Sequence, residues 1–167
     1  MKKIFIYSSS NGQSLKICEA LNKNKESLVI DIDMLKTAKL DNFDQIVIGA
    51  SVKYGDHNKK VYEFVKKNRV LLEKKKTVFF SVNATARKSE KNTPKTNPYI
   101  IKFLKKTNWT PDHIGVFAGM VDFPNYNFIE KYIIKLIMWI TNGPTDTSKT
   151  FEFTNWEDVK KFSEEIN

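Results

Sequence analysis

The sequence predicts an α/β fold in which helices cover both faces of a parallel sheet. Five apolar runs lack the alternation of apolar and polar residues typical of a half-exposed strand, so we expect both faces of each strand to be buried. Amphipathic segments stand between these runs, as helices do where they connect parallel strands. Because this alternation continues through all 167 residues without a repeat or a low-complexity linker, we expect a single domain, residues 1–167.

The expected strands are short and rich in β-branched and aromatic residues, which suit the pleated surface of a sheet. In chain order they cover residues 3–8, 28–32, 44–50, 77–82 and 113–119. Residues 150–153 add a short extended piece. Residues 9–14 form a polar turn after the first strand, and loops at 51–58 and 83–96 follow the third and fourth strands.

The expected helices carry apolar residues three or four positions apart, which places these residues on one face. In chain order they cover residues 14–24, 59–72, 97–107, 129–140 and 155–166, with a short helical or irregular link at 34–40. Pro98 suits the first turn of the third helix, where an N–H group is not needed. Asn155 suits the N-cap of the last helix. Cys18 falls on the apolar face of the first helix, so we expect it in the core.

The charge of the chain is unevenly distributed. Its 28 basic and 19 acidic residues give a net charge of +9. Residues 53–106 hold sixteen basic and four acidic residues, a net charge of +12, and the remainder carries −3. Such an excess is typical of proteins that meet nucleic acid, an anionic membrane surface or an acidic small molecule. No recognition helix or base-stacking motif accompanies it, so we expect no nucleic-acid partner.

Residue counts argue against several kinds of site. The single cysteine allows no internal disulfide and no cysteine-ligated cluster, and His57 and His113 lack the spacing of metal ligands, so we expect no metal. The six glycines form neither the dinucleotide fingerprint nor the phosphate loop of ATPases. We find no signal peptide and no run of about 20 apolar residues that could span a bilayer. We therefore expect an intracellular protein.

Polar residues after the first strand form a candidate anion site. They are Ser9, Ser10, Asn11, Gly12, Gln13 and Ser14. The following helix offers N–H groups and a partial positive charge, the hydroxyls can donate to phosphate oxygens, and Gly12 permits close approach of the backbone. The absence of a lysine favours a terminal monophosphate. The same residues could instead form an ordinary N-cap turn.

Two further loops should complete this site, because ligands of open parallel sheets bind at the carboxyl ends of the strands. The loop at 51–58 contains Tyr54, whose ring could stack on a flat ligand or lie on the surface as an ordinary tyrosine. The backbone of residues 82–86 could contact the edge of such a ligand.

Several longer motifs carry a family resemblance that covers nearly the whole chain. They are S-x-x-G-Q-S at 9–14, VIGASVKYG at 47–55, EFVKKN at 63–68, FFSVNATARKSEKNTPKTNPY at 79–99, KFLKKTNW at 102–109, VFAGM at 116–120, KLIMWITNGPTDT at 135–147 and FTNWEDV at 153–159. With them the chain resembles the menaquinone-dependent protoporphyrinogen IX dehydrogenases, a family of flavodoxin-like FMN proteins in bacterial haem synthesis. The VNATARK stretch and the late insert are the most specific of these motifs.

The resemblance implies a flavodoxin-like three-layer sandwich whose five-stranded parallel sheet has the order 2-1-3-4-5, with a helical insert at about 121–149. It implies an oxidoreductase that binds FMN noncovalently, oxidises protoporphyrinogen IX to protoporphyrin IX and passes electrons to menaquinone or another quinone. Residues 9–14 would bind the FMN phosphate. The isoalloxazine would be bordered by Ser51, Val52, Lys53, Tyr54, Gly55, Val82, Asn83, Ala84, Thr85 and Ala86. The protein would be cytoplasmic and peripherally associated with the inner face of the cell membrane.

Three residues near these loops have possible roles in the reaction. Arg87 is one of only two arginines, and its fork-shaped side chain suits a carboxylate, so Arg87 and Lys88 are candidates for anchoring the substrate propionates. Arg87 could instead be a solvated loop residue. His57 could exchange a proton during ring oxidation or could be a bystander in its loop.

The helix expected at 129–140 has nine apolar residues among twelve and a length of about 18 Å, too short to span a bilayer. It could pack in the core, cover the substrate site, or lie in a membrane interface with Lys131 and Lys135 outward.

As an alternative function, the chain could be an electron-carrier flavodoxin without a substrate of its own, although such carriers are typically acidic around the flavin.

Overall fold

A parallel sheet forms the centre of the molecule. The computed structural model describes residues 1–23, 27–35 and 39–167. The strands of this sheet are β1 (Lys3–Ser8), β2 (Leu28–Asp31), β3 (Gln45–Lys53), β4 (Asp56–His57), β5 (Lys76–Val82) and β6 (His113–Phe117). Their order is β2-β1-β3-β5-β6, and β4 pairs antiparallel with β3. Without the short β4, this is the expected order 2-1-3-4-5, and the flavodoxin-like sheet is confirmed.

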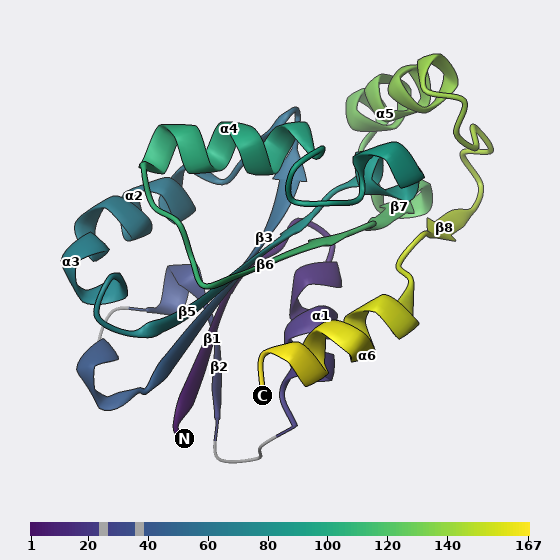
Figure 1. The fold of residues 1–167 in the computed structure, drawn as a ribbon. Helices are drawn as coiled ribbons and strands as arrows, with labels where there is room; N and C mark the ends of the chain where they lie inside the picture. Colours follow the sequence, from purple (N-terminus) through teal and green to yellow (C-terminus); the bar gives the residue numbers. More distant parts are fainter. Residues whose placement is uncertain (24–26, 36–38) are drawn as a thin grey trace.

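Helices cover both faces of the sheet (Figure 1). They are α1 (Gln13–Leu21), α2 (Lys59–Lys67), α3 (Arg69–Leu72), α4 (Pro98–Thr107), α5 (Phe128–Ile140) and α6 (Trp156–Glu165). Neighbouring residues of a strand point to opposite faces, so Ile46 and Ile48 share a core with α2 and α4, whereas Val47 shares one with α1 and α6. The sheet is therefore buried on both sides, as its apolar strands predict.

The helix starts follow the local sequence closely. The Asn97 side chain accepts hydrogen bonds from the backbone N–H groups of Tyr99 and Ile100, and Pro98 occupies the first turn. Asn155 caps α6 in the same way. Cys18 is fully buried on α1, as expected.

Several expected boundaries are wrong. Strand β3 continues to Lys53 and forms a hairpin with β4, so the expected loop at 51–58 is largely paired. The helix expected at 59–72 is interrupted at Asn68, whose side-chain amide donates to the Phe64 carbonyl and which ends α2 and begins α3.

Other elements differ in length. Strands β2 and β6 end earlier than expected, and two 3₁₀ turns, Ala84–Arg87 and Ser89–Lys91, lie within the loop expected at 83–96. Residue 24 of the expected helix 14–24 and residues 36–38 of the expected link 34–40 lie outside the described residues.

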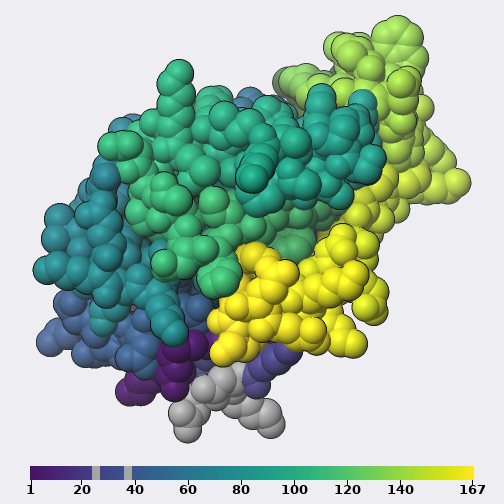
Figure 2. All heavy atoms as spheres, viewed as in Figure 1, coloured from purple at the N-terminus to yellow at the C-terminus, as the bar shows by residue number. Residues whose placement is uncertain are grey.

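The late insert forms its own small layer. Strands β7 (Met120–Asp122) and β8 (Thr150–Glu152) pair antiparallel, and α5 lies between them in the chain. A separate apolar cluster of Val121, Phe123 and Met138 holds this layer together. Figure 2 shows α5 as a projection from one end of the molecule.

Helix α5 is not a core helix. Met138 is the one fully buried side chain among its 13 residues, and eight large apolar side chains are exposed. They are Phe128, Ile129, Tyr132, Ile133, Leu136, Ile137, Trp139 and Ile140. Within the described ranges, we find no helix long and apolar enough to cross a membrane.

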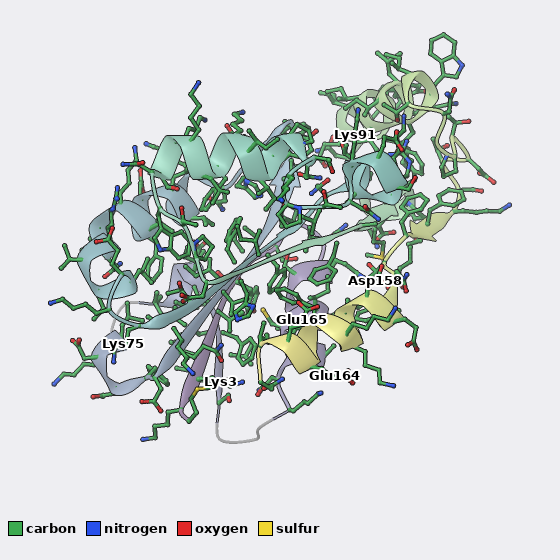
Figure 3. All side chains as sticks on the ribbon, in the orientation of Figure 1. Lys3, Lys75, Lys91, Asp158, Glu164 and Glu165 are labelled. Carbon is green, nitrogen blue, oxygen red and sulfur yellow. The ribbon has the colours of Figure 1, made fainter. Side chains whose placement is uncertain are left out.

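The basic residues of 53–106 are divided between the two ends of the sheet. Lys75 immediately precedes β5 and lies at the amino ends of the strands, whereas Lys91 follows β5 at their carboxyl ends (Figure 3). The net charge of +12 in this segment is thus not gathered at one edge of the sheet.

Candidate functional site

Three loops meet at the carboxyl ends of β1, β3 and β5. These strands are neighbours in the sheet, with Ser8 opposite Ala50 and Ser51 opposite Val82. The segments 9–14, 51–55 and 82–87 therefore start from the same edge. The Ser51 hydroxyl oxygen accepts from the Ser10 N–H at 3.1 Å and lies 3.2 Å from the Ser10 hydroxyl, which joins two of them directly.

The first loop has the shape and the donors of a phosphate site. Gly12 adopts a φ of 81° immediately before α1, and open space lies where its side chain would be. The Ser14 N–H donates to the Ser9 hydroxyl, which folds the loop over the helix start. The Ser14 hydroxyl is buried and has no hydrogen-bond partner among the described residues. A buried hydroxyl at a helix N-terminus fits an anion that would complete its hydrogen bonding.

The late insert supports this loop from outside. The Asn11 amide donates to the Met120 carbonyl at 2.8 Å, and the Gln13 amide donates to Glu152 and Thr154, each at 2.8 Å. Sequence reasoning missed these supports, because contacts between residues more than 100 positions apart leave no periodic signal.

The second loop is a tight hairpin turn. Tyr54 and Gly55 have φ values of 51° and 82°, as in the two-residue turns that suit the twist of paired strands. Positive φ is rare for a bulky residue and often marks a functional site. The Tyr54 side chain stands at the tip of the hairpin, and the residue is 60% exposed.

Glu130, on the first turn of α5, contacts this hairpin. Its Oε1 atom accepts from the Lys53 Nζ at 2.6 Å and from the Tyr54 hydroxyl at 2.9 Å. The Lys53 hydrogen bond lowers the pKa of Glu130, and the Glu130 hydrogen bonds raise the pKa values of Lys53 and Tyr54. Glu130 was missed from the sequence, although the Asn127-x-x-Glu130 pattern is a readable capping box.

The third loop is built on a buried polar network. The Asn83 side-chain oxygen accepts from the Ala86 N–H at 3.0 Å, and its amide donates to the Ser81 hydroxyl at 3.0 Å. The Asn97 amide also donates to the Asn83 oxygen, at 3.2 Å. Because these groups are buried and bonded to one another, the turn at 84–87 is held in one conformation.

His57 lies beneath the loops and not in one of them. It belongs to β4, is 4% exposed, and its Nε2 lies 2.9 Å from the Ser81 hydroxyl oxygen. The rings of Phe79 and Phe103 meet it edge-on. Burial lowers the pKa of His57 to about 4, so the ring is neutral at pH 7. The expected position in an open loop is therefore wrong, and the surroundings do not favour proton exchange with a bound substrate.

Arg87 contacts α5, which corrects its interpretation as a solvated loop residue. Its Nη2 donates to the Thr141 carbonyl at 2.8 Å and to the Thr141 hydroxyl at 2.7 Å, and its Nη1 donates to the Ala84 carbonyl at 2.8 Å. Lys88, the next residue, is half-buried. The role of both residues toward a substrate stays a prediction.

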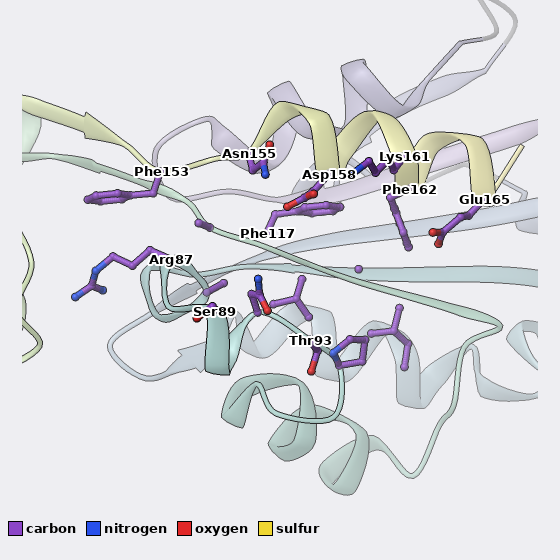
Figure 4. A pocket seen from close by; sticks show the side chains of 17 residues that line it. Arg87, Ser89, Thr93, Phe117, Phe153, Asn155, Asp158, Lys161, Phe162 and Glu165 are labelled. Atoms are coloured by element: carbon purple, nitrogen blue, oxygen red, sulfur yellow. The ribbon is translucent and has the colours of Figure 1, made fainter.

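A cavity of about 420 Å³ lies on the outer side of β6, between the segment 86–94 and α6 (Figure 4). Phe117, Phe153 and Phe162 line it, and Arg87 stands at one end near the Phe153 ring. Only Ala86 and Arg87 belong both to the cavity and to the three loops. Residues 9–14 and Tyr54 lie outside this cavity, so we take the edge where the three loops meet as the candidate site. Among the described residues we find no group of three His, Cys, Asp or Glu side chains placed to hold a metal ion.

Comparison with known proteins agrees with this geometry. A family model described as a flavodoxin domain matches residues 4–148. Protoporphyrinogen IX dehydrogenase (quinone) of Escherichia coli (strain K12) is 39% identical over 171 residues, which cover 99% of this chain and 94% of that protein. The protein of the same name from Leishmania major is 34% identical, covering 99% of this chain and 74% of its own length.

Solved structures give the same fold. Oxidised flavodoxin 2 and flavodoxin 1 of Bacillus cereus superpose with TM-scores of 0.54 and 0.51, at 14% and 18% identity, and cover 99% of this chain and 97% of each flavodoxin. The shared feature is the parallel sheet with helices on both faces.

Proposed function

Because this chain belongs to the flavodoxin-domain family of protoporphyrinogen IX dehydrogenases, we propose that it oxidises protoporphyrinogen IX to protoporphyrin IX and passes the electrons to a quinone. The 39% identity to the Escherichia coli enzyme, over almost the full length of both chains, carries this conclusion. The chain is a flavoprotein oxidoreductase of the haem pathway.

The flavin in this proposal is FMN, held by its phosphate in residues 9–14. A terminal phosphate suits the open space at Gly12, the N-terminus of α1 and the Ser14 hydroxyl, which has no partner among the residues that the structure describes. A monophosphate fits a loop that contains no lysine. FMN should accordingly bind more tightly than riboflavin, which lacks the phosphate.

The flat ring of the flavin would lie between the hairpin tip and the turn after β5. A bound flavin supplies a ring that takes up electrons and a proton from a substrate and returns them to an acceptor. In this arrangement Tyr54 covers one side of the ring and excludes water from it. The turn at 84–87, which Asn83 holds through the Ala86 N–H, would border its edge. These residues orient the ring and set its electrostatic surroundings.

The substrate carries two propionates, and the basic residues next to the turn would bind them. Lys88 is the simpler anchor, because three N–H···O contacts of Arg87 are already made to Ala84 and Thr141. Arg87 would then contribute charge and hold the turn in place.

In this proposal, helix α5 is the surface through which the protein contacts the membrane and the quinone dissolved in it. Its exposed apolar side chains form an arc, and Lys131 and Lys135 lie at one margin of this arc. An amphipathic helix of this kind suits an anionic bilayer surface, with the apolar arc in the acyl boundary and the lysines among the headgroups. In this proposal the protein is cytoplasmic, binds the inner face of the cell membrane and uses menaquinone dissolved there.

The deciding experiment is an anaerobic assay of the purified, FMN-loaded protein with protoporphyrinogen IX and a water-soluble quinone analogue. We expect porphyrin fluorescence to appear together with reduced quinone. Absence of porphyrin above the uncatalysed rate, with the flavin fully bound, would overturn the proposal. One-electron exchange with a flavodoxin reductase under those conditions would instead support a carrier without a substrate.

A further inference from the structure

Helix α5 is fastened at both ends to the two loops that border the proposed flavin site. At its N-terminal end, Glu130 accepts from Lys53 and Tyr54 of the β3–β4 hairpin. At its C-terminal end, Thr141 accepts from Arg87 of the turn after β5. Between these points, Met138 packs in the small apolar cluster of the insert. The helix thus spans the distance from one loop to the other.

The contact at the N-terminal end brings three groups together. The Glu130 side chain is 18% exposed, and its Oε1 atom receives both hydrogen bonds from the hairpin. The Lys53 ammonium also lies 5.2 Å from the centre of the Tyr54 ring. One carboxylate therefore both orients the phenol and balances the positive charge beside it.

From this geometry we infer that Glu130 is a positioning residue for the oxidation reaction, which sets the orientation of the Tyr54 ring and offsets the charge of Lys53. The inference rests on the proposed flavin site, because Tyr54 matters for the reaction only if its ring covers the flavin.

The Tyr54 ring depends on this contact because it stands at a hairpin tip and is mostly exposed. An exposed side chain populates several rotamers unless a specific bond selects one. A hydrogen bond from a hydroxyl to a carboxylate is among the stronger polar contacts in proteins. Loss of Glu130 would release the ring and leave the Lys53 charge without its counter-ion.

Glu130→Gln is the informative substitution. Glutamine can still accept the N-cap hydrogen bond from the Asn127 backbone, so the start of α5 is preserved, but the negative charge is lost. Tyr54→Phe removes only the hydroxyl. Asn127→Ala is the control for helix stability, because it removes the cap hydrogen bond of the Glu130 N–H but keeps the Glu130 carboxylate and its charge. Glu164→Gln, on α6, is the control for loss of one negative charge elsewhere.

Four properties of each FMN-loaded variant would be measured: flavin fluorescence, the dissociation constant for FMN, the flavin reduction potential, and kcat and KM for protoporphyrinogen IX. We expect Glu130→Gln to raise flavin fluorescence, to weaken FMN binding roughly two- to tenfold and to move the potential to a more positive value, because an unbalanced cation near the ring favours the reduced, more negative flavin. Tyr54→Phe should reproduce the change in fluorescence but not the change in potential.

The double variant separates the two effects. If Glu130 acts on fluorescence through the Tyr54 hydroxyl, the double variant should resemble Tyr54→Phe in fluorescence and Glu130→Gln in potential. The two control variants should leave both signals at the wild-type level. Wild-type signals in Glu130→Gln, from a wild-type protein that binds FMN and forms porphyrin, would overturn the inference. Failure of the wild type itself to bind FMN or form porphyrin would count instead against the proposed function.

Discussion

Arg87, on the turn after β5, donates to both the carbonyl and the hydroxyl of Thr141, 54 residues further along the chain. Thr141 is the C-cap residue of α5, so the Arg87 guanidinium caps the C-terminal end of this helix and holds it against the edge of the candidate site. A charged donor at a helix C-terminus is also favoured by the helix dipole.

Replacing Arg87 by lysine should loosen the end of α5. An ammonium does not reproduce the fork geometry that serves Thr141 and Ala84 together, so we expect the free energy of unfolding to fall by about 1–3 kcal/mol. Urea unfolding would measure this change, and amide exchange at the C-terminal end of α5 would locate it. Arg69→Lys, at the exposed Arg69–Glu73 pair, should change stability much less. An Arg87→Lys protein with unchanged stability but a higher KM for protoporphyrinogen would show that Arg87 acts on the substrate.

Removing the Ser14 hydroxyl should have opposite effects on the free protein and on its complex with FMN. This hydroxyl is buried and has no hydrogen-bond partner within the described part of the chain, so Ser14→Ala should leave the unfolding free energy of the flavin-free protein unchanged or raise it by up to about 1 kcal/mol. The loss of a phosphate contact should weaken FMN binding roughly tenfold. Ser163→Ala is the matched control, because the buried Ser163 hydroxyl contacts the Leu21 carbonyl and the Asn167 amide. It should lower stability and leave FMN affinity unchanged; equal FMN affinity in Ser14→Ala and wild type would contradict the phosphate site.

His57 should make the protein less stable in mild acid. Its pKa is lowered from an ordinary value of 6.5 to about 4 by burial, so between these values the unfolded chain binds a proton that the folded chain does not. The contribution of neutral His57 to the free energy of unfolding is fully present above pH 6.5 and is lost as the pH drops toward 4. The free energy of unfolding should therefore fall by about 2 kcal/mol between pH 7 and pH 5. Asp56, whose pKa is lowered by its bonds to Lys102, Lys106 and Tyr62, stays ionised over this range.

The measurement is urea unfolding at pH 7 and pH 5 for the wild type and for His57→Gln. The variant should be less stable at pH 7, because it disturbs the bond to Ser81, but should lose less stability on acidification. The same pH dependence in both proteins would show that His57 does not cause it.

The outer face of α5 should control binding to anionic vesicles. Ile140 is 65% exposed on this face, and Ile140→Glu should weaken binding to vesicles that contain phosphatidylglycerol about tenfold or more. Val70, which is 69% exposed on α3, provides the matched control Val70→Glu. Activity with a water-soluble quinone should be preserved in both variants. Vesicle binding by Ile140→Glu at the wild-type level would exclude α5 as the membrane contact.

Much of the fold could be predicted because the signals are local. Apolar runs indicate the five long strands, and single residues mark helix starts: Asn97 and Asn155 satisfy N–H groups only two or three positions away. The predicted anion loop depends on equally local signals, since Gly12 is the N-cap residue of α1 and Ser14 lies in its first turn. The sequence predicts a loop where the hairpin at Tyr54 and Gly55 lies, because β4 has only two residues and the turn lacks an Asn-Gly pair.

The sequence by itself determined the order of the five main strands and of the helices between them, the Asn155 cap of α6 and the family; the anion-binding role of residues 9–14 stays a prediction. Only the tertiary structure decided that His57 is buried, that Glu130 reaches Tyr54 across 76 positions, and that α5 keeps its apolar arc exposed. The physical reason is the separation in sequence of the residues that interact. Caps and strand patterns depend on residues a few positions apart, whereas burial depends on which distant surfaces meet. A helix that is apolar on most sides carries the same pattern whether a core or solvent surrounds it.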